Sequence, residues 1–137
     1  MSLQIPVRLV RLVRERAGDV CEYCVLPQAS QEATFHVDHV LPRSQNGPTE
    51  MANLALACVT CSLRKAARTK ATDPRTGNAV PLFNPRSDLW PDHFAFTSTW
   101  RLRGRTQTGR ATIEALGMNR PAIVLIRREL VLLDRFP

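Results

Sequence analysis

The chain has 137 residues, 44% of them hydrophobic, which is enough for one globular domain with its own core and too little for two of ordinary size. No run approaches the roughly 18 uninterrupted apolar residues of a membrane span, and arginines interrupt the apolar N-terminus, unlike a signal peptide, so we expect a soluble, cytoplasmic protein with no membrane partner. The formal charge of +7 and the pI near 10.2 are typical of proteins that bind phosphates, although a genome rich in arginine codons would produce the same excess of arginine.

Residues 1–20 have the periodicity of an amphipathic helix. Their apolar positions form one stripe, made of Ile5, Leu9, Leu12 and Val13. Pro6 is tolerated in the first turn of a helix. We expect the stripe to pack on the segment that follows, and the interspersed arginines either to stay solvated or to contact phosphates.

All cysteines of the chain lie in two CxxC pairs, Cys21 with Cys24 and Cys58 with Cys61. Thiolates with this spacing can turn toward one ion, and two such pairs complete the tetrahedral site that structural zinc prefers. The alternatives are disulfides, which the reducing cytosol disfavours, and a redox CxxC, which requires a βαβ setting that the sequence does not show. We therefore predict one structural zinc ion with a closed coordination shell.

The segment between the two pairs begins with a predicted strand. Residues 34–40 have the β-branched and aromatic content of a strand, in which Phe35 and Val37 share one face and His36 and Asp38 share the other. The alternation therefore places an imidazole and a carboxylate side by side.

A loop, a second strand and a helix follow. Pro42 and the Asn-Gly-Pro sequence at 46–48 end the first strand in an irregular loop. Residues 54–57 predict a short strand that runs into the second cysteine pair, and residues 62–68 predict a helix. The predicted order after the first pair is strand, loop, strand, helix.

These residues resemble the HNH endonucleases. The string FHVDHVLPRSQNG is followed by NLALAC and by CSLRK. The Asp-His pair, the Pro-Arg-Ser turn, the Asn before the second strand and the CxxC that opens the helix agree with that family in order and spacing. The resemblance covers residues 21–68 and implies a small zinc-stabilised ββα-metal (His-Me finger) module framed by the two CxxC pairs.

The resemblance also implies roles for single residues. Hydrolysis of a phosphodiester requires a deprotonated water and neutralisation of the charge that develops on the phosphate. By resemblance, His39 is the general base, Asp38 ligates a catalytic Mg²⁺ or Mn²⁺, and the amide of Asn53 braces the loop and keeps the base oriented.

Ser62 departs from the family pattern, which usually has Asn or His at this second metal-ligand position. A serine hydroxyl is a shorter and poorer ligand than either of these. Three interpretations stay open: Ser62 still binds the cation with lower affinity, His36 or a substrate phosphate compensates, or the site is weakened or inactive. His36 itself is either a further ligand beside Asp38 or a hydrogen-bonded structural residue.

Basic residues close to the predicted site are candidates for nucleic-acid contacts. They are Arg43, Arg64, Lys65 and Arg68. A helix that faces a scissile phosphate should carry such donors, whereas the alternative for each is a solvated face. The predicted partner is double-stranded DNA.

The remaining segment predicts an extension of strands and two helices. Residues 71–91 read as turns and extended loop, and two strands are expected near residues 93–96 and 99–102. Arginines at alternate positions 101, 103 and 105 form a basic stripe on the second strand, and His93 is expected to be packed. Thr108 is expected to cap one helix, and Asn-Arg-Pro at 119–121 to begin another.

Together these features predict an α+β fold in one domain over residues 1–137. It consists of an N-terminal helix (1–20), the zinc-framed module (21–70) and the C-terminal extension packed on it (71–137). The predicted function is hydrolysis of DNA by a metal-dependent endonuclease with structural zinc and catalytic Mg²⁺ or Mn²⁺. One alternative is a zinc-dependent module that binds nucleic acid without cutting it, and another is a structural zinc domain that contacts a protein.

Overall fold

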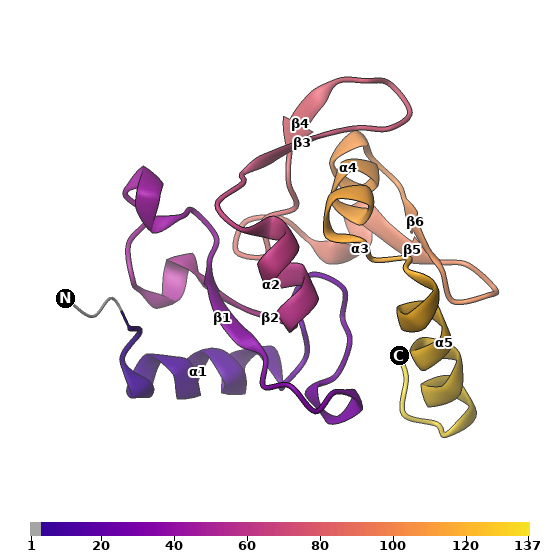
Figure 1. The fold of residues 1–137 in the computed structure, drawn as a ribbon, viewed down its shortest axis with the longest axis horizontal. Coiled ribbons are helices and arrows are strands. Elements are labelled where there is room, and N and C mark those ends of the chain that lie inside the picture. Colours follow the sequence, from indigo (N-terminus) through magenta and orange to yellow (C-terminus); the bar gives the residue numbers. More distant parts are fainter. Residues whose placement is uncertain (1–3) are drawn as a thin grey trace.

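In the computed structural model, which describes residues 4–137, short helices and two-stranded antiparallel sheets form an α+β fold (Figure 1). Helix α1 (Val7–Ala17) follows Pro6 and ends at Gly18, whose φ of 64° suits a glycine C-cap. Val13 is fully buried, and Ile5 and Leu9 pack against the same core, as the apolar stripe predicts. Residues 1–3 of the predicted helical segment lie outside the described residues.

Two arginines attach α1 to the segment that follows. The guanidinium of Arg14 donates to the carbonyl oxygen of Phe35 at 2.6 Å, and that of Arg16 donates to the carbonyl oxygens of Met51 and Leu54. These contacts correct the sequence-based expectation that the helical arginines are solvated or bind phosphates. Only some arginines of α1, such as the exposed Arg11, fit the solvated interpretation.

The predicted strand, loop, strand and helix are present. Strand β1 (His36–His39) pairs antiparallel with β2 (Leu54–Ala57), with His36 opposite Ala57 and His39 opposite Leu54. All four residues of β2 are buried. Helix α2 (Val59–Lys65) begins inside the second CxxC pair, earlier than predicted, and stops at Lys65 because Ala66 has a φ of 50°. Three short 3₁₀ turns complete this part: Gln28–Ser30, Arg43–Gln45 and Met51–Asn53.

The C-terminal extension contains more regular structure than predicted. The segment predicted as loop holds a hairpin of β3 (Lys70–Thr72) and β4 (Ala79–Pro81), and a short helix α3 (Trp90–His93). A second hairpin joins β5 (Phe94–Phe96) to β6 (Leu102–Gly104). Helices α4 (Gln107–Leu116) and α5 (Pro121–Leu132) follow.

One detail of the extension differs from the prediction, and another agrees with it. The N-cap of α4 is Thr106, whose hydroxyl accepts from the amide of Gly109 at 2.9 Å, and not Thr108. His93 is packed, as predicted: its Nδ1 lies 2.6 Å from the Thr106 hydroxyl, and its ring stacks edge-on against Phe83.

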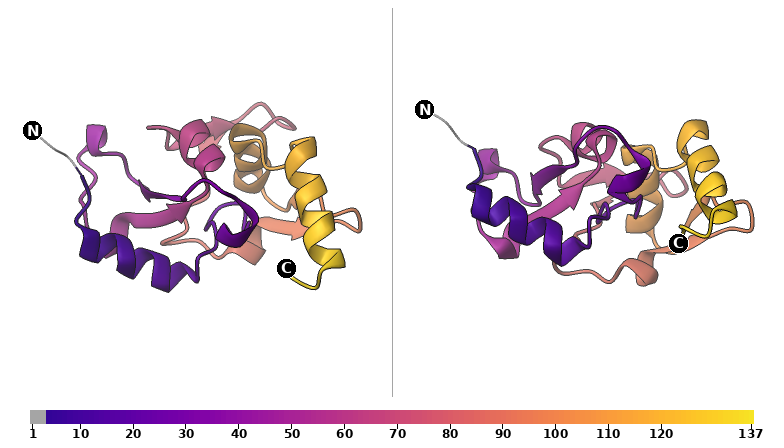
Figure 2. Two further views of the ribbon diagram at one scale, coloured as in Figure 1. Left: turned by 60° about the horizontal axis from the view of Figure 1, so that its bottom comes forward. Right: turned by 90° about the horizontal axis from the view of Figure 1, so that it is seen from below.

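Helices α1 and α5 lie toward opposite ends of the molecule in both views of Figure 2. The common core runs between them and includes β2, the cysteines, and Phe94 and Leu116 of the extension. Within residues 4–137, no helix is long and apolar enough to cross a membrane.

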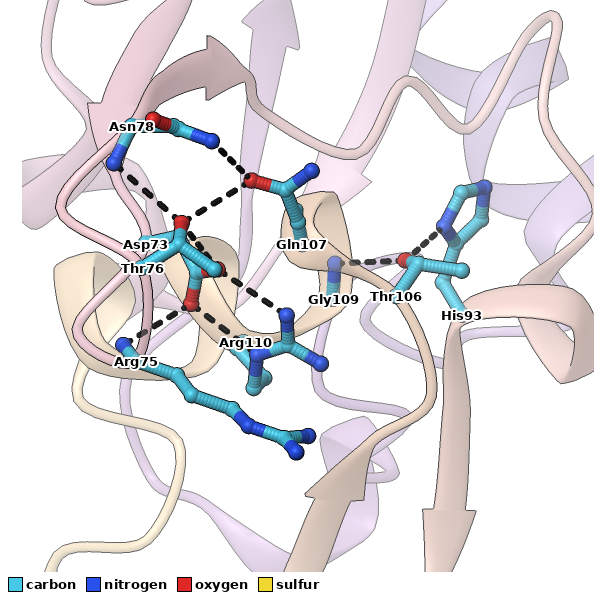
Figure 3. Close-up of polar contacts among 9 residues, drawn as sticks. All are labelled: Asp73, Arg75, Thr76, Asn78, His93, Thr106, Gln107, Gly109 and Arg110. Atoms are coloured by element: carbon cyan, nitrogen blue, oxygen red, sulfur yellow. Dashed lines mark hydrogen bonds and ion pairs between the residues drawn. The ribbon is translucent and has the colours of Figure 1, made fainter.

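The β3–β4 turn is held by a carboxylate from within it. Asp73 is fully buried, accepts from the Arg75 amide and the Thr76 hydroxyl, and receives both Nε and Nη2 of Arg110 on α4 at 3.0 and 2.9 Å (Figure 3). The hydrogen bonds from Arg110 hold the pKa of Asp73 well below its usual 3.8. This clamp explains why a turn rich in Pro, Gly and Asn is ordered.

We predict that Asp73→Asn lowers the melting temperature by several degrees, because it removes the charged pair with Arg110. Since the folded pKa is depressed, the contribution of Asp73 is fully present above about pH 4 and is lost as the pH falls below the unfolded value of 3.8 toward the folded one. Thermal melts between neutral pH and pH 3 measure this effect. Glu32→Gln, at an exposed position with no hydrogen bond or ion pair in the described chain, is the control. A wild-type protein and an Asp73→Asn variant that melt together at neutral pH would contradict the prediction.

Candidate functional site

The four cysteines form one buried cluster. The sulfurs of Cys21, Cys24, Cys58 and Cys61 all lie within 4.8 Å of one another, and none of these residues is more than 5% exposed. The sulfurs of Cys24 and Cys58 are 3.8 Å apart. Zinc bonds of about 2.3 Å in a tetrahedron place two sulfurs about 3.8 Å apart, so the cluster fits one zinc ion. Among residues 4–137, it is the one group of three or more Cys, His, Asp or Glu side chains gathered closely enough to hold an ion.

The backbone around the cysteines prepares the cluster for thiolates. The amide of Cys24 points at the sulfur of Cys21 at 3.5 Å, and the amide of Cys61 points at the sulfur of Cys58 at 3.4 Å. Hydrogen bonds from Cys21, and then from Cys24 and Cys61, lower the pKa of the Cys58 thiol, whereas hydrogen bonds within the cluster raise the pKa values of Cys24 and Cys61. A metal binds the deprotonated form, and the two backbone amides stabilise that form at Cys21 and Cys58.

Asp38 points from β1 toward helix α2. Its Oδ2 accepts from the Tyr23 hydroxyl at 3.0 Å and from Lys65 Nζ at 3.1 Å. Within the described residues, no donor contacts Oδ1. Burial raises the pKa of Asp38 above its usual 3.8, and Lys65 and Tyr23 oppose that rise. One carboxylate oxygen is thus fixed by the protein, and the other remains available to a ligand.

His39 ends β1 and faces the loop that follows. Its Nε2 lies 2.8 Å from the Thr49 hydroxyl and accepts from Arg43 Nε at 3.2 Å. Burial, followed by the charge of Arg43, lowers the pKa of His39 below its usual 6.5. The imidazole is therefore neutral at neutral pH, which is the state that a general base requires.

Asn53 braces the loop between the strands. Its Oδ1 accepts from the Leu41 amide at 2.9 Å, and its Nδ2 donates to the carbonyl oxygens of Leu41 and Pro48 at 3.0 and 2.9 Å. Gly47 is required in this loop, because a Cβ atom there would lie 1.7 Å from the Leu41 oxygen. The side chain of Asn53 thus ties the loop carrying Arg43 and Thr49 to the end of β1.

His36 and Ser62 lie together at the surface. His36 Nδ1 and Ser62 Oγ are 2.9 Å apart, and His36 is exposed. His36 and Asp38 are two residues apart on β1, and both contact α2, His36 through Ser62 and Asp38 through Lys65. The structure therefore brings the three candidate cation ligands to one face of β1, beside the same helix.

The basic candidates divide into two groups. Arg43 is half-buried beside His39, while Arg64 and Arg68 are exposed on and after α2. Arg68 also donates to the carbonyl oxygen of Ala115 at 3.3 Å. Lys65, in contrast, is 2% exposed and donates to Asp38 and to the His39 carbonyl oxygen at 3.1 Å. Its ammonium faces the interior and not the surface expected for a phosphate contact.

We predict that Lys65→Met lowers the free energy of unfolding by about 3–5 kcal/mol, because it leaves the Asp38 carboxylate partly buried without its cation. Arg64→Met, one residue earlier and exposed, should change stability by less than about 0.5 kcal/mol. Chemical denaturation of both variants with zinc present measures the difference. Equal and small effects would place the Lys65 ammonium in solvent.

Sequence reasoning did not identify Tyr23 and Thr49 as parts of the site. Tyr23 lies between the first two cysteines, where only its hydroxyl could suggest a polar partner. Thr49 lies in a loop whose sequence indicates turns and no particular contact. Both acquire their roles from residues distant in the sequence, Asp38 and His39.

The antiparallel pair β1–β2 is followed by a helix, with an Asp-His pair at the end of the first strand and a four-cysteine cluster beside it, which is the arrangement that the resemblance implies. A protein-family model described as HNH endonuclease matches residues 21–68, which confirms the resemblance over that segment. The match covers about a third of the chain and indicates a nuclease or another function related to nucleic acids. Neither the search of curated proteins nor that of solved structures gave a match.

Proposed function

We propose that the protein is a metal-dependent endonuclease that hydrolyses phosphodiester bonds of double-stranded DNA. The observation that carries the proposal is the arrangement of Asp38, whose Oδ2 is held by Tyr23 and Lys65 while its Oδ1 has no donor among the described residues, next to a neutral His39.

The protein residues have separate tasks in this proposal. His39 accepts a proton from the attacking water, and the hydrogen bond between its Nε2 and Thr49 orients the ring. Arg43 contacts a phosphate oxygen once DNA displaces it from His39. Asn53 keeps the loop closed, so that Arg43 and His39 stay on the same side of the site.

Asp38, with Ser62 and His36, would hold the divalent cation. One carboxylate with neutral oxygen and nitrogen donors fits Mg²⁺ or Mn²⁺, which complete their shells with water and substrate phosphate. When bound, the cation neutralises the charge on the phosphate and the leaving oxygen. The 2.9 Å contact between His36 and Ser62 fits both interpretations of His36, a hydrogen-bonded structural residue and a further ligand beside Asp38.

The deciding experiment is a plasmid-nicking assay with zinc-loaded protein and added Mg²⁺ or Mn²⁺. Conversion of supercoiled to open-circular DNA that requires the added cation supports the proposal. Absence of cleavage over the whole range of cation concentrations would reject it. A parallel binding titration separates the remaining alternatives, because affinity for DNA should fall steeply with salt concentration, whereas a protein-binding zinc domain shows no such DNA binding.

A further inference from the structure

A buried arginine in the last helix has no anionic partner. Arg127 of α5 is 0% exposed and is the largest fully buried side chain among the described residues. Its guanidinium donates to the carbonyl oxygens of Met118 at 2.6 Å and Trp100 at 3.2 Å, and to the Asn119 side chain at 3.5 Å. All of these acceptors are neutral, and Nε has no hydrogen-bond partner.

Burial of such a cation requires compensation. A guanidinium stays charged at any pH that a protein tolerates, so Arg127 cannot become neutral as a buried lysine can. Within residues 4–137, each of the ion pairs involves another cation: Arg11, Lys65, Arg86 or Arg110. An unpaired buried charge costs several kcal/mol. The negative charge must therefore come from a group other than a carboxylate in contact with Arg127.

The cysteine cluster can supply that charge when its thiols are deprotonated. Burial lowers the pKa of Arg127, the charges that Cys24 and Cys61 carry in their deprotonated form oppose this effect, and the nearby arginines add to it. Ile123, one turn before Arg127 on the same face of α5, lines a small cavity together with Cys58. The face of α5 that carries Arg127 thus packs toward the cluster. Four thiolates around Zn²⁺ carry a net charge of −2, whereas four neutral thiols would carry none.

We infer that Arg127 is the buried counter-charge of a zinc tetrathiolate at Cys21, Cys24, Cys58 and Cys61, and that it couples helix α5 to retention of the metal. The ring of Phe96, 5.7 Å from the guanidinium carbon, and the neutral acceptors fix the cation in place, and the metal centre supplies the charge that they lack. This role concerns the zinc site and holds whether or not the protein cuts DNA.

The test compares zinc release from full-length protein carrying Arg127→Gln or Arg127→Lys. Glutamine keeps hydrogen-bond donors without the charge, and lysine keeps the charge without the planar fork. Transfer of zinc to a chromophoric chelator at neutral pH is followed by absorbance. We expect release from the glutamine variant to be about 10–100 times faster than from the wild type. The lysine variant should stay close to the wild type, as should Arg128→Gln at the neighbouring exposed position.

Equal release rates for the lysine and glutamine variants would overturn the inference, as would wild-type release from the glutamine variant. If a variant does not stay folded without saturating zinc, the zinc concentration needed for half-maximal refolding replaces the release rate. The same ranking, with glutamine weaker than lysine, is then expected. A charge-independent packing role for Arg127 would weaken both variants alike.

Discussion

Replacing Cys58 by serine should abolish stoichiometric zinc binding and unfold the module at room temperature. Structural zinc contributes on the order of 10–16 kcal/mol in small zinc domains, which is at least comparable with the whole stability of a typical domain, about 5–15 kcal/mol. Here the four cysteines also belong to the common core, together with β2 and Leu116 of α4. Loss of the metal therefore removes a cross-link from the core itself.

Circular dichroism melts and metal analysis of the purified variant measure this effect. Thr60→Ala, between the second pair of cysteines and half-buried, is the matched control and should retain zinc and fold. Chelation of zinc from the wild type should reproduce the loss of structure seen with Cys58→Ser. Purified wild-type protein without zinc, or a serine variant that melts like the wild type, would show that the cluster is a group of free thiols.

Replacing His39 by alanine should lower the rate of DNA cleavage by about 10²–10⁴, the usual contribution of a general base. The hydrogen bonds of the imidazole go to Thr49 and Arg43 in the loop, so the fold and the affinity for DNA should change little. Initial rates of plasmid nicking at saturating cation, together with a DNA-binding titration, separate the two effects.

Two neighbouring variants control for the His39 experiment. Thr49→Val removes the hydrogen bond to the ring and should reduce the rate less than loss of the base itself, since the base remains. His36→Ala should raise the cation concentration needed for half-maximal cleavage, because His36 is assigned to the cation and not to the water. Cleavage by His39→Ala at the wild-type rate would assign the base to another residue.

The site could be predicted wherever its signals are local. The spacing of the cysteines identifies a cluster, and the alternation along β1 places His36 and Asp38 on one face, because both patterns depend only on backbone geometry. The strand Leu54–Ala57 was predicted with its observed bounds, because the apolar run ends directly before the second CxxC pair.

Features that depend on distant partners were missed. The β3–β4 hairpin reads as loop, because its order comes from Arg110, which lies in a helix much later in the chain. Lys65 looks like a surface cation on a short helix, because nothing in the sequence indicates that Asp38 and the His39 carbonyl lie within its reach. Arg14 and Arg16 of α1 are a third case, because they donate to backbone carbonyl oxygens, and such acceptors leave no pattern in the sequence.

The two donors to Asp38 Oδ2 come from the two segments that carry the CxxC pairs. Tyr23 lies between the cysteines of the first pair, and Lys65 ends the helix that the second pair opens. Each of these two segments therefore contacts the carboxylate through a single side chain. In a sample with partial zinc occupancy, molecules lacking the metal would hold this carboxylate loosely. They would count toward the protein concentration without adding to the measured rate of cleavage. For that reason, the specific activity of the proposed nuclease should be calculated per bound zinc and not per total protein.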